Sequence, residues 1–242
     1  MPRIVTYNVH RCVGTDGRLD VGRIAAVIDA LEPDIVALQE LDVGRARTGG
    51  VDQAHEVARR LDMTFHFNAA MQVEEERYGD AILTSYPERL VKAGGLPGLD
   101  PRLKLEPRGA LWVEATIDGR PLQVINTHLG LVPREQQLQA AALAGAAWLG
   151  RVGQGDPTIL LGDFNATRAS VVYRTLSRRL TDARRRVVHN GLSSTFPSRF
   201  PMLRIDHAFL SPDIRALAIG APYNSLTRVA SDHLPLVVDF QL

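Results

Sequence analysis

The spacing of short apolar segments is the feature that most limits how this chain can fold. Segments rich in β-branched residues cover residues 3–9 and 34–40, and residues 21–34 between them carry apolar residues at helical spacing. Further along, residues 108–117 and 121–130 are two more strand-like segments, joined at the turn sequence DGRP. Strands that alternate with helices favour parallel pairing, whereas strands joined by a tight turn pair antiparallel. The pattern therefore predicts an α/β protein with mixed rather than purely parallel sheets.

The remaining apolar segments extend this pattern to the C-terminus. Further strands are predicted at residues 80–85, 158–165, 204–211, 214–220 and 234–240. Amphipathic or helix-forming segments predict helices at residues 51–63, 133–149 and 170–179. The longest loop-like region, residues 93–109, is expected to be a surface excursion rather than a boundary. No linker divides the chain, so we expect a single domain over residues 1–242.

Composition and charge are those of an ordinary globular protein. Hydrophobic residues make up 45% of the chain and charged residues 23%, and the net charge of +1 is lower than a sequence-independent DNA binder usually has. The single cysteine, Cys12, excludes an intrachain disulfide and a cysteine zinc site, and it fits a reducing compartment. No signal-peptide pattern opens the chain, and residues 138–150, the longest weakly polar segment, are too short to span a bilayer. We therefore expect a cytoplasmic protein.

Polar side chains stand at the ends of most predicted strands. The segment ILLGDFNA, residues 159–166, leads from a buried strand directly into Asp163 and Asn165, although burying an unpaired carboxylate costs roughly several kcal/mol. Comparable positions hold Asn8, Glu40, Asn126, His128, Asp206, Asp232 and His233. Ligand sites of α/β sheets collect at such strand ends. Oxygen donors of these types suit Mg²⁺ or Mn²⁺, and a histidine beside an aspartate can bind phosphate and move protons.

Six short motifs, taken in order, resemble one known family. TYNVH, LQELD, NTHLG, GDFNA, RIDHAFLS and SDHLPL are similar to the motifs of the endonuclease/exonuclease/phosphatase superfamily, and the match runs from Tyr7 to Pro235. This is the fold group of pancreatic deoxyribonuclease, abasic-site endonucleases, neutral sphingomyelinases and inositol polyphosphate phosphatases. The resemblance implies a four-layer sandwich, in which two mainly antiparallel sheets pack face to face with helices on both outer sides. It also implies a divalent cation, Mg²⁺ or Mn²⁺, as the cofactor.

The resemblance assigns metal-binding roles to three positions. Asn8 and Glu40 would hold the divalent metal, with Glu40 as the central ligand. Asp232 is expected to hold His233 in place and to belong to the metal site as well. For Asn8 and Glu40 the alternative interpretation is an ordinary polar residue at the end of a strand.

The resemblance assigns the reaction itself to five further residues. Asp163 would orient or deprotonate the attacking water, and Asn165 would donate hydrogen bonds to the phosphate oxygens. His128 would contact the phosphate and protonate the leaving oxygen, whereas His233 would bind the phosphate and stabilise its growing charge. Asp206 would orient the His233 side of the site or contribute to metal binding; its alternative role is a salt bridge with nearby Arg204.

Two residues depart from the family pattern. His10 stands where many nucleases of the family carry an acidic residue, which puts a secondary metal contact in doubt. Asp80 replaces an asparagine, and a carboxylate there would repel a substrate anion unless it were protonated or bound to metal.

These observations predict a metal-dependent phosphoesterase that uses in-line attack by an activated water. The preferred substrate is a lipid-like or small phosphodiester, because the chain resembles compact bacterial members grouped with phospholipid phosphodiesterases. The first alternative is a DNA endonuclease or exonuclease, and a sugar or inositol phosphatase comes next. An alternative of another class is a catalytically silent protein that binds a phosphate-bearing ligand or a protein. We expect a monomer.

Overall fold

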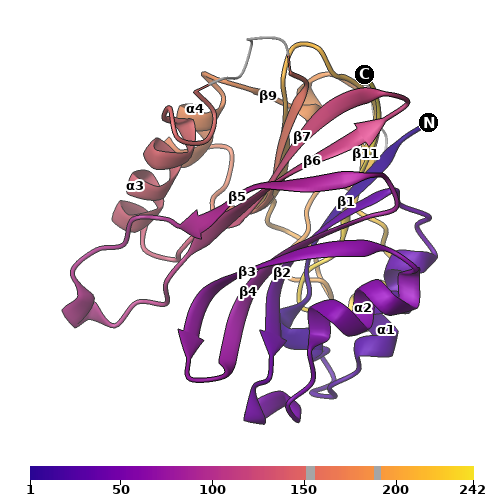
Figure 1. The fold of residues 1–242 in the computed structure, drawn as a ribbon, viewed down its shortest axis with the longest axis vertical. Coiled ribbons are helices and arrows are strands. Elements are labelled where there is room, and N and C mark those ends of the chain that lie inside the picture. Colours follow the sequence, from indigo (N-terminus) through magenta and orange to yellow (C-terminus); the bar gives the residue numbers. More distant parts are fainter. Residues whose placement is uncertain (151–155, 188–191) are drawn as a thin grey trace.

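Two sheets packed face to face make up the body of the protein (Figure 1). The computed structural model describes residues 1–150, 156–187 and 192–242. The first sheet has the order β11-β12-β1-β2-β4-β3, and its strands are β1 (Arg3–Asn8), β2 (Ile35–Val43), β3 (Thr64–Val73), β4 (Glu76–Thr84), β11 (Arg215–Gly220) and β12 (Leu236–Gln241). The second has the order β5-β6-β7-β8-β10-β9, and its strands are β5 (Glu88–Gly95), β6 (Gly109–Ile117), β7 (Arg120–His128), β8 (Thr158–Asp163), β9 (Thr181–Asp182) and β10 (Asp206–Leu210).

Each sheet contains one parallel strand pair among antiparallel ones. β1 pairs with β2 in parallel, and β7 pairs with β8 in parallel. All other neighbouring strands run antiparallel. The predicted α/β class with mixed sheets is therefore confirmed.

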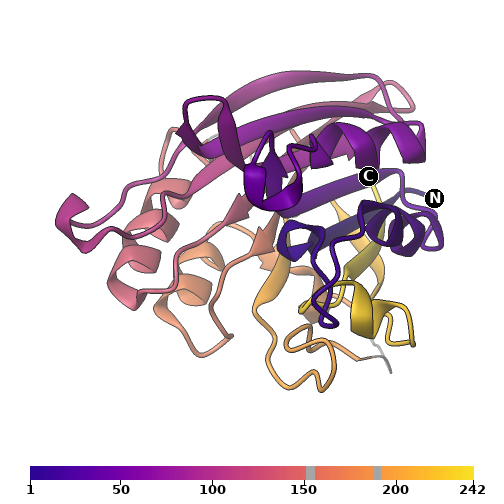
Figure 2. The same ribbon diagram turned by 90° about the horizontal axis from the view of Figure 1, so that it is seen from below.

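Helices cover the outer face of each sheet (Figures 1 and 2). The helices are α1 (Val21–Asp29), α2 (Gln53–Leu61), α3 (Pro133–Ala144), α4 (Val171–Leu176) and α5 (Thr227–Ala230). One apolar cluster fills the space between the sheets, a second lies under α1 and α2, and a third lies under α3 and α4. The four-layer arrangement implied by the family resemblance is thus confirmed.

Several elements differ from the sequence prediction, among them the short β9 and α5, for which no element was predicted. The strands β3 and β5 were not predicted, because each lies at the edge of a sheet, where charged or exposed residues interrupt the alternation of apolar and polar positions. Helix α3 ends at Ala144 instead of continuing to residue 149, and its buried face includes Glu135, Gln136 and Gln139. In the part of the chain that the structure describes, none of the helices is both long enough and apolar enough to cross a membrane.

A hydrogen-bonded bridge joins the two sheets beneath their parallel pairs. The Asn126 side chain, fully buried on β7, donates to the carbonyl oxygens of Leu38 and Ala81 in the opposite sheet. Its oxygen accepts a hydrogen bond from Gln39 Nε2 at 2.7 Å. Three backbone segments are therefore held together by one amide side chain, and the facing strand ends keep a fixed separation.

Candidate active site

The C-terminal ends of the two parallel strand pairs bring the predicted residues together. Asn8 is the last residue of β1, and His128 and Asp163 are register partners at the ends of β7 and β8. Glu40 lies in β2 at a β-bulge, where the register shifts between Leu38 and Leu41. Its left-handed φ of 62° turns the side chain out of the regular alternation. Since the sheets face each other, groups from both meet in one place.

Asn8 connects the two sheets at this point. Its amide nitrogen donates to Glu40 Oε1 and to Asp163 Oδ2, both at 3.0 Å. Its amide oxygen accepts the backbone N–H of His10. The turn that supplies this N–H is a strained one, because His10, Arg11 and Cys12 all have positive φ angles. Asn8 is thus held in one orientation with its donors toward two carboxylates.

The environment of Asp163 explains how a buried strand can end in a carboxylate. The side chain is 1% exposed, and it accepts hydrogen bonds from Asn8 Nδ2 and from the backbone N–H of Asn165. Burial and the nearby charge of Asp206 raise the pKa of Asp163, against the effect of the His233 charge. A carboxylate in this setting is well suited to accept a proton near neutral pH.

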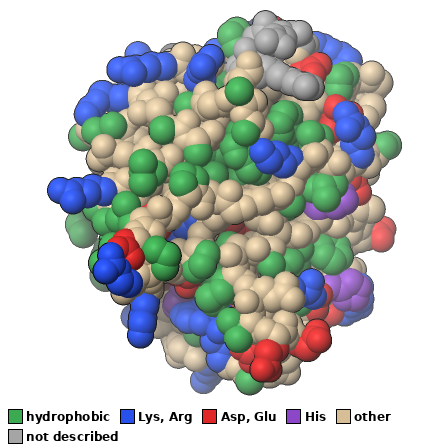
Figure 3. Space-filling model, turned by 60° about the vertical axis from the view of Figure 1, so that its left-hand side comes forward, with side chains coloured by type: hydrophobic (Ala, Val, Ile, Leu, Met, Phe, Trp, Pro, Cys, Tyr) green, Lys and Arg blue, Asp and Glu red, His purple; other side chains and the backbone are tan. Residues whose placement is uncertain are grey.

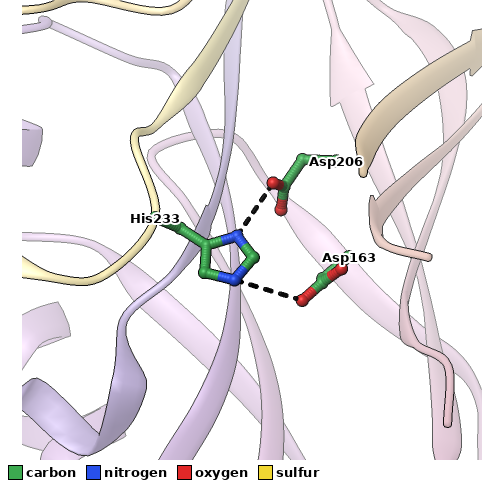
Figure 4. Close-up of side chains that lie close together, drawn as sticks. All are labelled: Asp163, Asp206 and His233. Atoms are coloured by element: carbon green, nitrogen blue, oxygen red, sulfur yellow. Dashed lines mark hydrogen bonds and ion pairs between the residues drawn. The ribbon is translucent and has the colours of Figure 1, made fainter. Parts of the chain in front are cut away.

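His233 lies between two carboxylates (Figure 4). Its Nδ1 is 2.9 Å from Asp206 Oδ2, and its Nε2 is 3.6 Å from Asp163 Oδ2. Burial alone would lower the pKa of His233, but the charges of Asp206 and Asp163 outweigh burial and raise it. The ring is therefore an imidazolium at neutral pH, fit to face an anion.

Of the two aspartates predicted to position His233, only Asp206 makes a hydrogen bond with its ring among the described residues. Asp232 was expected to fix this ring, but the hydrogen bond to Nδ1 comes from Asp206, and the prediction for Asp232 was wrong on that point. Asp232 is half-buried, and its carboxylate accepts a weak hydrogen bond from Ser231 Oγ at 3.3 Å. The alternative role for Asp206 was also wrong, since Arg204 pairs with Asp182 instead.

Ser231 fixes the loop that carries His233. Its hydroxyl donates to the backbone carbonyl of Asn8 at 2.7 Å and lies 3.3 Å from the backbone N–H of His233. The loop before β12 is therefore tied to the end of β1. The sequence analysis assigned no role to this serine, although it belongs to the SDHLPL motif.

The second histidine, His128, is held in the opposite protonation state. Arg108 Nη1 lies 2.9 Å from His128 Nδ1, and because a guanidinium only donates, Nδ1 is an accepting nitrogen of the ring. Burial and the charges of Arg108 and His233 keep the pKa of His128 well below its usual value. Its Nε2 is 3.6 Å from Asp163 Oδ2 and 3.9 Å from Glu40 Oε1. The site thus combines a neutral and a charged histidine.

Arg108 is a site residue that the sequence analysis missed. It lies just before β6, is 8% exposed, and pairs with Glu106 as well as contacting His128. In the sequence, Arg108 could have been noticed only as the arginine that precedes an apolar strand in EPRGALW. Its neighbours in the chain do not distinguish it from a solvent-exposed arginine at the start of a strand.

Asn165 completes the group from the loop after β8. Its side-chain nitrogen is 3.1 Å from His128 Nε2 and donates to the carbonyl oxygen of Leu129 at 3.0 Å. Its backbone has a positive φ of 47°, and its carbonyl oxygen accepts from Gln136 on α3. The buried polar face of α3 therefore positions this loop.

The two departures from the family pattern have different environments. Among the described residues, the His10 ring makes hydrogen bonds only within its own turn, with Val13 and Arg11, while its backbone N–H donates to Asn8 Oδ1. Asp80 is opposite the β2 bulge, and burial raises its pKa to about 8 although Arg108 opposes this. Asp80 is therefore mostly protonated at neutral pH, so that its repulsion of an anion is reduced.

The donor set fits a hard divalent cation. The Glu40 carboxylate is 20% exposed and, among the described residues, accepts one hydrogen bond, from Asn8. Asp163, Asp206 and His233 also offer ligand atoms within 4.8 Å of one another. His233 is the weaker ligand, because it is bonded to Asp206 and charged, whereas a metal-bound imidazole must be neutral. The Glu40 carboxylate is therefore the better match to Mg²⁺ or Mn²⁺, which prefer oxygen donors, whereas the Asn8 oxygen accepts the His10 N–H in this structure.

Comparison with known proteins decides the family. The model of the Endonuclease/Exonuclease/phosphatase family matches residues 5–233. The chain belongs to this family. The resemblance carried by the six motifs is thereby confirmed, and members of the family are hydrolases that act on phosphate esters.

Similar proteins cover the whole chain at low sequence identity. The uncharacterized protein YbhP of Escherichia coli is 25% identical over 256 residues, which is 99% of this chain and 96% of YbhP. An endonuclease/exonuclease/phosphatase structure from Beutenbergia cavernae has a TM-score of 0.81 at 25% identity and covers 100% of this chain and 71% of its own. A mannosyl-6-phosphatase from Bacteroides thetaiotaomicron has a TM-score of 0.77 at 19% identity, with 100% of both chains covered. The last of these shows a shared fold alone.

Proposed function

We propose that this protein is a divalent-metal-dependent phosphodiesterase that acts on a lipid-like or small phosphodiester. The observation that carries the proposal is the meeting of Glu40 and Asp163 with two histidines, whose Nε2 atoms each lie 3.6 Å from Asp163 Oδ2, beside the ends of the two parallel strand pairs. Phosphoester hydrolysis needs an activated water opposite the leaving oxygen and charge stabilisation on the phosphoryl oxygens. Each requirement has a matching side chain.

The roles follow from the protonation states. Asp163, whose pKa is raised, accepts the proton of the attacking water, and the His233 imidazolium, held by Asp206, binds the phosphoryl oxygens. His128 presents Nε2–H to the phosphate or the leaving oxygen, and Asn165 offers its amide beside it. Glu40 would hold Mg²⁺ or Mn²⁺ together with Asn8, and Asp232 would be a further metal-site residue. When bound, the cation lowers the pKa of water and neutralises charge on the phosphate.

A direct assay tests the proposal. The protein is incubated with Mg²⁺ or Mn²⁺ and bis(p-nitrophenyl) phosphate, with a chelator and the His233→Ala variant as controls. We expect hydrolysis that needs the metal and falls by about 10²–10⁴-fold in the variant. Glu40→Ala is expected to weaken activity and metal dependence together. Full activity in either variant would mean that the site is assigned wrongly.

Parallel substrates separate the alternatives. A phosphomonoester, supercoiled plasmid and phospholipid vesicles are tested under the same conditions. On the face drawn in Figure 3, Lys and Arg side chains are spread around the periphery and do not form a continuous stripe, which favours small substrates over a long polyanion. Plasmid cleavage alone would support a nuclease, and metal binding without any turnover would support the catalytically silent alternative. We expect the enzyme to act as a cytoplasmic monomer.

A further inference from the structure

A cavity next to the catalytic histidine His128 has no role in the chemistry described above. It measures about 350 Å³ and is lined by the excursion loop, by Arg108 and by Glu135. Residues 96–107 of this loop project beyond the sheets beside α3 (Figures 1 and 2). Most of the loop side chains on the wall are apolar: Leu96, Leu99, Pro101, Leu105 and Pro107. Arg108 lines the cavity and also lies 2.9 Å from Nδ1 of the catalytic His128, so it belongs to both the cavity and the candidate active site.

Glu135 is the unexplained group in this cavity. The residue is 3% exposed, yet its carboxylate accepts no hydrogen bond from any residue that the structure describes. Glu135 is the third residue of α3, and its carboxylate lines the cavity. Since no described residue donates to this carboxylate, water or a ligand in the cavity must supply the donor.

Two glycines make room for this carboxylate. A Cβ at Gly130, two residues after His128, would lie 2.0 Å from Glu135 Oε2, so that no other residue fits there without movement. A Cβ at Gly98 in the excursion loop would lie 3.7 Å from Oε1. Glu135 is therefore held between the loop that carries His128 and the loop that forms the cavity wall.

The charges of the cavity favour a neutral donor over a cation. Asp100 is already paired with Arg102, and burial raises the pKa of Glu135 although the positive charge of Arg108 opposes this rise. The charge of Glu135 is thus offset in part by its neighbour. A carboxylate acceptor beside a guanidinium donor suits hydroxyl groups, which need both.

We propose that this cavity is a subsite for a hydroxyl-bearing group, a polyol, esterified to the phosphate, and that Glu135 accepts its hydroxyl hydrogens. The inference rests on the proposed phosphodiesterase function, since the phosphate places the polyol beside Arg108. Glu135 is a specificity residue, and hydrolysis itself does not require it.

The experiment compares three chromogenic diesters that share a p-nitrophenyl leaving group and carry methyl, glycerol or choline as the second group. In the wild type, kcat/KM for the glycerol ester is expected to exceed that for the methyl ester at least about tenfold, the factor of one hydrogen bond to a charged group. Glu135→Gln should abolish this preference and leave the methyl ester within about twofold. Glu56→Gln, which changes a glutamate in the first turn of α2, should keep it.

A second variant and a binding measurement test the subsite independently of Glu135→Gln and of turnover. Gly98→Ala narrows the cavity through an ordinary contact and should reduce the preference for glycerol without lowering the unfolding temperature. Calorimetry in Ca²⁺ with methyl phosphate, glycerol phosphate and phosphocholine measures the same preference without turnover. Equal affinities and rates, binding too weak to distinguish the ligands, or a preference for choline would overturn the subsite. A binding preference for glycerol without turnover of any ester would overturn the phosphodiesterase and leave the subsite standing.

Discussion

At the scale of single residues, Gly162 decides whether Asp163 can reach its place. Its φ of 141° is in the region that only glycine adopts easily, and a Cβ would lie 1.9 Å from the carbonyl oxygen of Thr127 on β7. We expect Gly162→Ala to lower the free energy of unfolding by at least about 2 kcal/mol, because the parallel pair must separate. Urea unfolding measures this. Gly220→Ala is the control, since nothing lies within 4 Å of a Cβ there; equal losses would contradict the argument.

The two aspartates near His233 should differ in kinetic effect. Asp206→Asn removes the charge at 2.9 Å from His233 Nδ1 and is expected to lower kcat by about 10²-fold with little change in the Mn²⁺ concentration at half-maximal rate. Asp232→Asn should instead raise that Mn²⁺ concentration, as expected for a residue of the metal site. Metal titration of both variants checks the split. A larger kcat loss in Asp232→Asn would return the positioning role to Asp232.

At the scale of secondary-structure elements, Asn126 holds the sheets in register with each other. Asn126→Ala removes the side-chain donor to the buried carbonyl oxygens of Leu38 and Ala81, and it removes one of three acceptors of the Gln39 amide. We expect a loss of about 2–4 kcal/mol in the free energy of unfolding. Asn68→Ala is the comparison, because the Asn68 amide nitrogen is also buried but has no partner among the described residues. The loss should be clearly smaller there.

The edge strand β9 is fastened by a buried ion pair with a defined pH dependence. Asp182 accepts from Arg204 at 2.6 and 2.7 Å and from Tyr173, and these partners outweigh burial and lower its pKa. A lowered folded-state pKa stabilises the fold above the unfolded pKa of about 4, and this contribution is lost as pH falls through the folded value. Asp182→Asn should therefore cost about 3 kcal/mol at pH 7 and progressively less below pH 4.

The measurement for this pair is denaturant unfolding of wild type and variant between pH 7 and pH 3. Asp213→Asn, which changes an exposed aspartate, should follow the wild type throughout. A constant difference between wild type and Asp182→Asn across this range would show that the ion pair is not the source of the stability.

At the scale of the whole molecule, we expect the acidic site to lower the free energy of unfolding and a bound cation to raise it. Buried carboxylates from both sheets meet where Asn8 bonds to Glu40 and Asp163. Because a cation bound only to the folded chain stabilises it, Mn²⁺ at about 100 times its Kd should add about 2.7 kcal/mol, or roughly 5–10 °C in unfolding temperature. Differential scanning fluorimetry with Mn²⁺ and with chelator measures the shift. Glu40→Gln should lose it, and an undiminished shift in that variant would place the metal elsewhere.

Most of the architecture was predictable because its signals are local. Apolar periodicity located the strands that end in Asn8, His128 and Asp163 and the strand that contains Glu40, and the turn DGRP indicated the antiparallel pair β6 and β7. The edge strands β3 and β5 were missed, since a strand with one neighbour needs no regular alternation. The exact end of α3 was missed because Gly145 ends the helix within a segment whose apolar residues continue to residue 149.

The sequence by itself determined which chemical groups stand at the strand ends, because strand periodicity and the six motifs are properties of neighbouring residues. The tertiary structure alone decided the partners: Asp206 rather than Asp232 for His233, Arg108 for His128, and an unpaired Glu135 beside them. These pairs are separated by 27 and 20 positions in the chain. Hydrogen bonds and pKa shifts depend on distance and burial in space, which the packing of two sheets sets and no spacing along the chain records.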